Sequence, residues 1–70
     1  MQNYLTIIIN GDPFNCDESM SLTDILLYLN IDIHGVIIEY NSQIISKPQF
    51  DSVFFKTNDC IEIITIVGGG

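Results

Sequence analysis

The chain has 70 residues, 9 acidic side chains, 2 lysines and a formal net charge of −7. A chain of this length forms one domain, because it buries only about 60% of its unfolded surface and cannot divide that core in two. No apolar run approaches the roughly 20 residues of a membrane helix, and the acidic surface repels nucleic acid. We therefore expect a soluble domain whose charge either favours a basic partner or only keeps the domain in solution.

The chain begins with a predicted β-hairpin. Residues 4–9 are rich in β-branched side chains, and Asn10 and Gly11 form the dipeptide that most strongly favours a tight hairpin turn. Pro13 cannot donate to a ladder hydrogen bond, so it should open the second strand or lie on its edge. The second strand is expected to be short.

A predicted helix follows the hairpin. Ser21 has the character of an N-cap, and Asp24 stands where a capping box places an acidic side chain. The helix should begin at Leu22. Its apolar residues recur with helical spacing and form one stripe that can cover a sheet. These residues are Leu22, Ile25, Leu26 and Leu29.

The middle of the chain is less regular. Residues 35–41 alternate as a third strand with Glu39 on the solvent side, and residues 44–46 form a brief strand or extended turn. Pro48 is expected to exclude a helix at that point. The sequence leaves the secondary structure of residues 44–57 open. Four apolar side chains in this region are expected to close the end of the core: Phe50, Val53, Phe54 and Phe55.

The last predicted strand covers residues 60–67, with Glu62 on its outer face. The order strand, strand, helix, strand, short strand, strand predicts an α+β fold of the ubiquitin-like β-grasp type, with one helix across one face of a mixed four- to five-stranded sheet. The first and last strands should pair in parallel at the sheet centre. Residues 1–67 would form this domain, and residues 68–70 a flexible tail.

The tail consists of Gly68, Gly69 and Gly70 and follows a strong β-former directly. Glycine at a chain end gains nothing from packing, so three in succession suggest backbone that another molecule approaches closely. Extended glycines span about 3.5 Å each and would carry the terminal carboxylate about 10 Å beyond the sheet. A frayed chain end is the alternative interpretation.

Four isoleucines are expected on the sheet face opposite the helix: Ile8, Ile37, Ile64 and Ile66. One helix covers one face only, so these side chains would form an exposed apolar patch that binds a partner. A strand phase shifted by one residue would bury them instead.

Catalytic and metal-binding constellations are not expected. Cys16 and Cys60 are predicted to be free, structural thiols, since their spacing is not that of a zinc site and no cationic neighbour lowers their pKa. His34 is the single histidine. Without a base, nucleophile or metal cluster, we expect no enzyme activity.

Several motifs together resemble a known family. They are Ile-Asn-Gly at residues 9–11, Ser-Leu-Thr-Asp at 21–24, Ile-Glu-Tyr-Asn at 38–41 with Ile44, and Asn-Asp-Cys-Ile-Glu-Ile-Ile at 58–64 with the final glycines. They resemble the ThiS family of sulfur carriers of thiamine biosynthesis, over essentially the whole chain. Tyr40 departs from the family, which usually has an aliphatic residue there.

The resemblance implies a function for Gly70. An adenylating enzyme of the ThiF type would activate its carboxylate with ATP, and a sulfur donor such as a cysteine desulfurase would convert the adenylate to a thiocarboxylate. The sulfur would pass to a thiazole synthase of the ThiG type, and the carrier itself would hold no cofactor. Gly68 and Gly69 would be the narrow stem.

Two related functions remain open, because a di-glycine end also occurs in the small subunit of molybdopterin synthase and in ubiquitin-like modifiers. The short chain, the Glu39-x-Asn41 pair and the Val-Gly-Gly-Gly ending favour ThiS. The expected location is the cytoplasm or, given a composition typical of A+T-rich coding DNA, the plastid stroma.

Overall fold

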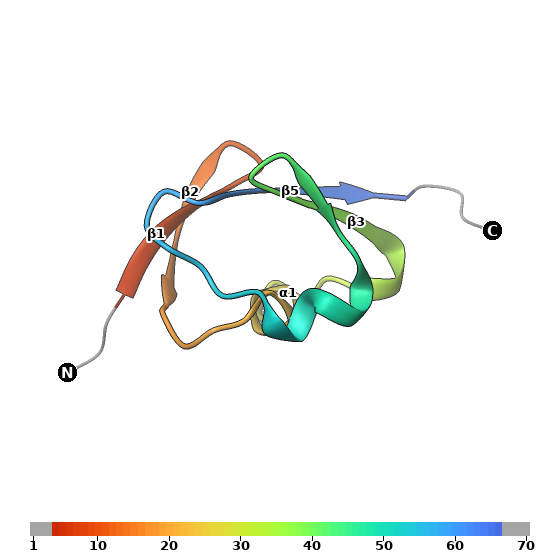
Figure 1. Ribbon diagram of the computed structural model, residues 1–70, viewed down its shortest axis with the longest axis horizontal. Helices are drawn as coiled ribbons and strands as arrows, with labels where there is room; N and C mark the ends of the chain where they lie inside the picture. The colour runs from red at the N-terminus through yellow and green to blue at the C-terminus, as the bar shows by residue number, and fades with distance from the viewer. Residues whose placement is uncertain (1–3, 67–70) are drawn as a thin grey trace.

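The computed structural model describes residues 4–66, and a five-stranded sheet with the order β2-β1-β5-β3-β4 forms its largest layer (Figure 1). One α-helix covers one face of this sheet. The elements are β1 Tyr4–Ile9, β2 Asp12–Asp17, α1 Leu22–Tyr28, the 3-10 helix η1 Ile33–Gly35, β3 Val36–Tyr40, β4 Gln43–Ile45, the 3-10 helix η2 Lys47–Ser52 and β5 Cys60–Thr65. The predicted β-grasp fold is confirmed.

The hairpin of β1 and β2 closes through a two-residue turn. Asn10 and Gly11 have φ angles of 50° and 86°, and two positive φ angles are what the favoured hairpin turn requires. β2 is an edge strand, so Pro13 deprives no neighbouring strand of a hydrogen bond. The hairpin turn and the edge position of Pro13 are confirmed, but the expectation of a short second strand is wrong, because β2 has six residues, as many as β1.

Helix α1 begins with the predicted capping box. The Asp24 N–H donates to Ser21 Oγ at 3.2 Å, and the Ser21 N–H donates to Asp24 Oδ2 at 3.0 Å. Leu22, Ile25 and Leu26 are buried, and the helix ends at Tyr28, after which Leu29 packs against the core as the C-cap residue. The apolar stripe therefore faces the sheet as expected.

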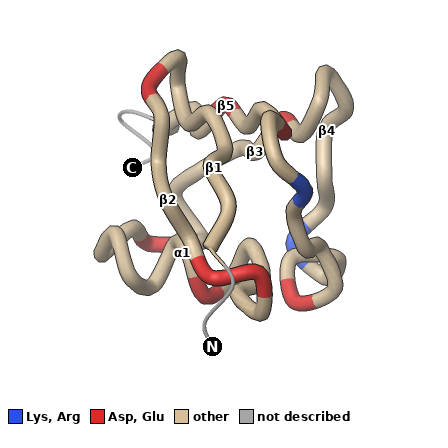
Figure 2. Tube along the Cα trace, turned by 90° about the vertical axis from the view of Figure 1, so that its left-hand side faces the viewer, with Lys and Arg blue, Asp and Glu red and all other residues tan. Residues whose placement is uncertain are grey.

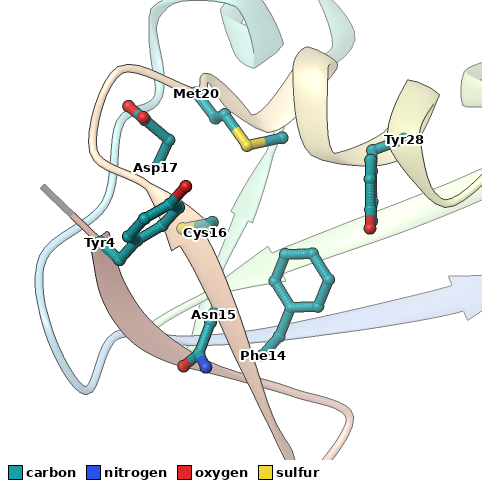
Figure 3. A pocket seen from close by; sticks show the side chains of 7 residues that line it. All are labelled: Tyr4, Phe14, Asn15, Cys16, Asp17, Met20 and Tyr28. Carbon is teal, nitrogen blue, oxygen red and sulfur yellow. The ribbon is translucent and has the colours of Figure 1, made fainter. Parts of the chain in front are cut away.

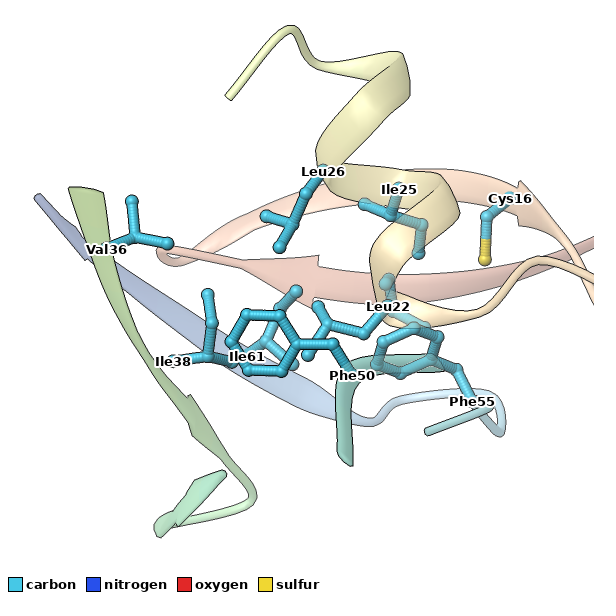
Figure 4. Close-up of a cluster of buried hydrophobic side chains, with 10 residues drawn as sticks. Cys16, Leu22, Ile25, Leu26, Val36, Ile38, Phe50, Phe55 and Ile61 are labelled. Atoms are coloured by element: carbon cyan, nitrogen blue, oxygen red, sulfur yellow. The ribbon is translucent and has the colours of Figure 1, made fainter. Parts of the chain in front are cut away.

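The core lies between α1 and the sheet (Figure 4). Ile7, Ile38 and Ile61, from three adjacent strands, are almost fully buried. Burying a side chain of this size contributes about 1.5–3 kcal/mol. The other buried members are Cys16, Leu22, Ile25, Leu26, Val36, Phe50 and Phe55.

Two expectations for residues 44–57 are wrong. Phe54 does not plug the core but is 52% exposed, because Val53 and Phe55 turn inwards and an extended backbone directs the residue between them outwards. Pro48 does not exclude a helix, since it lies in the first turn of η2. The N–H that proline lacks has no partner within the helix at that position.

The central strands pair as predicted. β1 and β5 are parallel, with Ile8 opposite Cys60, and β3 is antiparallel to β5. A parallel pair needs a long crossover connection, and here the chain between the two strands includes α1, which covers one face of the sheet. Residue 67, the predicted domain boundary and the tail lie outside the described residues.

Asp59 organises the turn that leads into β5. Its carboxylate accepts hydrogen bonds from the Tyr40 hydroxyl at 2.6 Å, the Lys56 N–H at 2.8 Å and the Asn41 amide at 3.2 Å. The Asn41 side chain also accepts the Cys60 N–H at 2.8 Å. The residue at which this chain departs from the ThiS pattern, Tyr40, therefore ties the end of β3 to the start of β5.

These contacts shift two pKa values. Burial alone would raise the pKa of Asp59, but the hydrogen bonds from Tyr40, Lys56 and Asn41 outweigh it and lower the pKa below its usual value of 3.8. Burial, followed by the contact with Asp59, raises the pKa of Tyr40 to about 12. The ionised carboxylate and the neutral phenol are thus the paired forms at neutral pH.

We predict that Asp59→Asn lowers the free energy of unfolding by about 1–2 kcal/mol at pH 7, because hydrogen bonds to a charged acceptor are the strong ones. A lowered folded-state pKa contributes stability above the unfolded pKa and loses it as the pH falls through the folded value. The difference between variant and wild type, measured by urea unfolding, should therefore narrow below about pH 4.

Asp51→Asn provides the matched control, because Asp51 is exposed on η2 and should tolerate the change within about 0.5 kcal/mol. Equal stability of Asp59→Asn and wild type at pH 7, or a difference that does not narrow in acid, would contradict the assigned role of Asp59.

Candidate functional site

The sheet face opposite α1, here called the outer face, is apolar and open. Ile61 is buried and Ile63 packs against the core on the helix side, so strand alternation directs Ile64 to the outer face. Ile64 is 47% exposed, and Ile37 is 40% exposed on β3. The predicted strand phase is therefore confirmed, and the alternative phase that would bury these side chains is excluded.

The four isoleucines predicted for docking lie on this face. Ile37 and Ile64 stand directly opposite each other on β3 and β5, a pairing that brings side chains into contact. Ile66 follows two residues after Ile64 and is 47% exposed, whereas Ile8 on β1 is half-buried. The structure shows their placement, and binding of a partner remains a prediction.

Ile44 is a further member that sequence reasoning missed. It lies on β4, opposite Glu39 of β3, and is 63% exposed, while its neighbour Ile45 packs against the core. The alternation between these two residues was the available signal, but three residues are too few to show a period. The outer-face patch is therefore defined as Ile8, Ile37, Ile44, Ile64 and Ile66.

Two carboxylates of like charge face each other within this patch. Glu39 and Glu62 are directly opposite on β3 and β5, one pair along from Ile37 and Ile64. Like charges at such a position destabilise a sheet. Neither Lys47 nor Lys56 forms an ion pair with them in residues 4–66, and the charge map of the trace shows acidic residues on most sides of the molecule (Figure 2). The pair offers a basic side chain of a partner two carboxylates at once.

Asn10 clamps β5 in place. Its side chain accepts the Ile63 N–H at 2.7 Å and donates to the Ile63 carbonyl at 3.3 Å, and its own N–H donates to the Ile61 carbonyl at 3.0 Å. The amide side chain thus makes the two hydrogen bonds that the backbone of a neighbouring strand would make, at a position beyond the end of β1. Sequence reasoning recognised Asn10 only as a turn residue, because the contact joins residues 53 positions apart.

β5 leads from the patch towards the tail. The Ile66 N–H donates to the Gly35 carbonyl at 2.9 Å, so the chain is held in the sheet up to that residue. Gly68, Gly69 and Gly70 lie outside the described residues, and their role stays a prediction.

The two thiols have different environments. Cys16 is buried in the core, and burial, followed by the charge of Asp17, raises the pKa of its thiol. Cys60 is exposed on the outer face opposite Ile8, and both cysteines are free. A structural role therefore fits Cys16, whereas Cys60 is not packed in the core as a structural thiol would be.

Other kinds of site find little support in residues 4–66. No group of three His, Cys, Asp or Glu side chains in this part of the chain is arranged to hold a metal ion. Among the same residues, no helix has the length and apolar content to span a membrane.

One pocket of about 310 Å³ lies between β2 and α1, away from the outer face (Figure 3). The rings of Phe14 and Tyr28 meet edge to face in it, with centroids 5.9 Å apart. Its thiol, Cys16, has a raised pKa and is thus poorly suited as a nucleophile. The remaining lining residues are Tyr4, Asn15, Asp17 and Met20.

Comparison with known proteins agrees with this geometry. The ThiS family model matches residues 7–70. The crystal structure of the thiamine biosynthesis protein ThiS from Geobacter metallireducens superposes with a TM-score of 0.79 and 29% identity, covering 94% of this chain and 100% of that one.

Similar sequences fall into two groups. An uncharacterized protein named ycf40 from Porphyra purpurea is 46% identical over 66 residues, which cover 94% of this chain and 93% of that protein. A thiazole synthase from Paramagnetospirillum magneticum is 32% identical over 66 residues, which cover 94% of this chain but 20% of the enzyme. Because the family model matches residues 7–70, nearly the whole of the chain, the chain belongs to the ThiS family of β-grasp sulfur carriers.

Proposed function

We propose that this chain carries sulfur as a thiocarboxylate on Gly70 for formation of the thiazole part of thiamine. Membership of the ThiS family supports this function. The observation that carries the proposal is the course of β5, which passes from the open outer face directly into the sequence Val-Gly-Gly-Gly. The folded domain then binds the partner, and the tail carries the reacting carboxylate.

The chemistry needs little from the chain beyond its carboxylate. In the first step the Gly70 carboxylate attacks the α-phosphate of ATP on a ThiF-type enzyme and pyrophosphate leaves. A sulfur donor such as a cysteine desulfurase presents a persulfide, whose terminal sulfur displaces AMP from the acyl adenylate and leaves an acyl disulfide. A thiol then attacks the donor sulfur of this disulfide, forms a new disulfide with it and releases the thiocarboxylate. Thiazole synthase of the ThiG type takes the sulfur, and the carboxylate is restored.

A narrow tail suits this chemistry, because an acyl adenylate must be kept from water while the sulfur attacks. Glycines have no side chains to obstruct entry into such a cleft. Three extended residues reach about 10 Å, enough to bring Gly70 into a partner's active site without moving the sheet. The chain is thus a substrate of its partners.

The outer-face patch is the proposed docking surface for the adenylating enzyme. It combines exposed isoleucines with the opposed pair Glu39 and Glu62, so a complementary partner surface would be apolar with a basic side chain at its centre. The net charge of −7 would also steer the chain towards such a surface.

Similarity to a thiazole synthase favours thiazole formation over molybdopterin synthesis. The enzyme from Paramagnetospirillum magneticum has a segment like this chain within its own, much longer sequence. A carrier and the enzyme that uses its sulfur are a natural pair to join. A carrier for molybdopterin synthase and a protein modifier remain the alternatives.

We propose that the chain works in the plastid stroma. Its relatives named ycf40 come from Porphyra purpurea and Pyropia yezoensis, algae that contain plastids, and they are 46% and 41% identical to it. Plastid-encoded relatives favour the stroma over the cytoplasm.

Intact-mass measurement tests the proposed chemistry. After incubation with ATP, a ThiF-type enzyme and a sulfur source, we expect the mass of the chain to rise by the difference between sulfur and oxygen. A chain lacking Gly70 should show no change. Conjugates to lysine side chains would identify a modifier, and an unchanged mass of the full chain would contradict the carrier function.

Ile64→Asp tests the docking surface. A charge in the centre of an apolar interface should lower kcat/KM for adenylation at least tenfold, because the carboxylate must lose its water on binding. Leu27→Asp is the matched control, since Leu27 is 67% exposed on α1, on the opposite face. Adenylation of Ile64→Asp at the wild-type rate would exclude this patch as the docking surface.

Glu39→Gln should change stability and binding in opposite directions. Removal of the like-charge pair should raise the free energy of unfolding by about 0.2–1 kcal/mol. The same change should weaken binding to the adenylating enzyme and reduce its dependence on salt. Urea unfolding and titrations at two salt concentrations measure the two effects. Unchanged affinity at low salt would show that no basic group of the partner faces Glu39.

A further inference from the structure

One short stretch of β5, although β5 is a central strand, has no neighbouring strand on one side within residues 4–66. β5 continues for several residues past the point where β1 ends at Ile9, because the hairpin turn carries the chain away to β2. The Asn10 side chain makes hydrogen bonds with the backbone N–H and carbonyl of Ile63, the first residue of β5 that faces this side beyond the end of β1. The next residue whose backbone faces that side is Thr65.

The hydrogen bonds on either side of β5 fix this orientation. On the β3 side, the Asn41 N–H donates to Cys60 and the Ile66 N–H donates to Gly35, so even-numbered residues face β3. On the β1 side, the Asp59 and Ile61 carbonyls accept backbone N–H groups of β1 and its turn, and the Ile63 N–H donates to Asn10. Odd-numbered residues therefore face β1. The Thr65 N–H and carbonyl therefore point to the β1 side, where residues 4–66 place no strand.

The outer edges of the sheet are protected, in contrast to this one. β2 carries Pro13 and two aspartates, and β4 is only three residues long. Charges, proline and shortness are the usual means by which proteins prevent unwanted strand pairing. Thr65 is exposed, uncharged and β-branched, so its edge retains the properties that allow a strand to be added.

We propose that one extended strand of the adenylating enzyme pairs with this edge. The Thr65 N–H would donate to a carbonyl of that strand, and the Thr65 carbonyl would accept an N–H from it, as in other recognition by strand addition. This inference rests on the proposed function and adds the backbone contact by which the partner holds the base of the tail.

Continuity with the patch and the tail supports this occupant. Ile64 and Ile66 flank Thr65 and point to the outer face, so a partner on the patch already lies beside the edge. The chain outside the described residues begins at residue 67, and five extended residues from Thr65 to Gly70 span about 17 Å. Fixing the backbone at Thr65 therefore fixes the point from which the carboxylate reaches the active site.

Amide hydrogen exchange of the isotopically labelled chain, alone and bound to the ThiF-type enzyme, tests the inference. We expect the Thr65 amide to exchange quickly in the free chain and at least tenfold more slowly in the complex. The Ile64 amide, which faces β3, should be protected in both states and serves as the internal control.

The outcomes separate the two claims. A complex that shifts the methyl signals of Ile64 but leaves Thr65 exchange unchanged would overturn strand addition and leave the docking surface intact. Failure to form any complex would contradict the proposed function and this inference together. Protection of Thr65 in the free chain that grows with its concentration would assign the edge to a second copy of this chain and overturn the inference.

A backbone ester at Thr65 provides a second test. Made by semisynthesis, it removes the N–H and keeps the side chain, and loss of one hydrogen bond should weaken binding about fivefold. Thr65→Val keeps the N–H and removes only the hydroxyl, so it should bind within about twofold of wild type. Equal affinity of the ester and wild type would overturn the inference.

Discussion

The parallel pairing of β1 with β5 is the constraint on which the rest of the structure depends. It places the first and last strands of residues 4–66 side by side at the centre of the sheet and requires a long connection between them, which here includes α1. Asn10 lengthens the pairing beyond the end of β1. Residues 60–63 of β5 are therefore held between β1 with Asn10 on one side and β3 on the other.

The same constraint leaves one face of the sheet open. In the described part of the chain, one α-helix of seven residues covers the core, and the outer face keeps exposed isoleucines and an opposed pair of glutamates. Both features cost stability in the free chain, since water contacts apolar surface and like charges repel each other. A partner that covers the apolar surface and supplies a positive charge removes both costs. The relief of these destabilising features then contributes to the free energy of binding.

Local signals made most of the fold predictable. Asn10 and Gly11 define the hairpin, Ser21 defines the helix start, and alternation in β3 and β5 defines the outer face. Long-range contacts were beyond such reasoning: the clamp of Asn10 on β5 and the hydrogen bonds around Asp59 depend on strand register, which no short pattern encodes. Phe54 was misplaced because an aromatic residue in an irregular segment was assumed to be buried.

The central claim is that sulfur from the Gly70 thiocarboxylate enters a thiazole. Transfer of radioactive sulfur from the loaded chain, in the presence of thiazole synthase and its other substrates, tests this most directly. We predict that the label appears in the thiazole product and leaves the chain in equal amount. Label that stays on the chain, or that passes only to a pterin when molybdopterin synthase is supplied, would contradict the account.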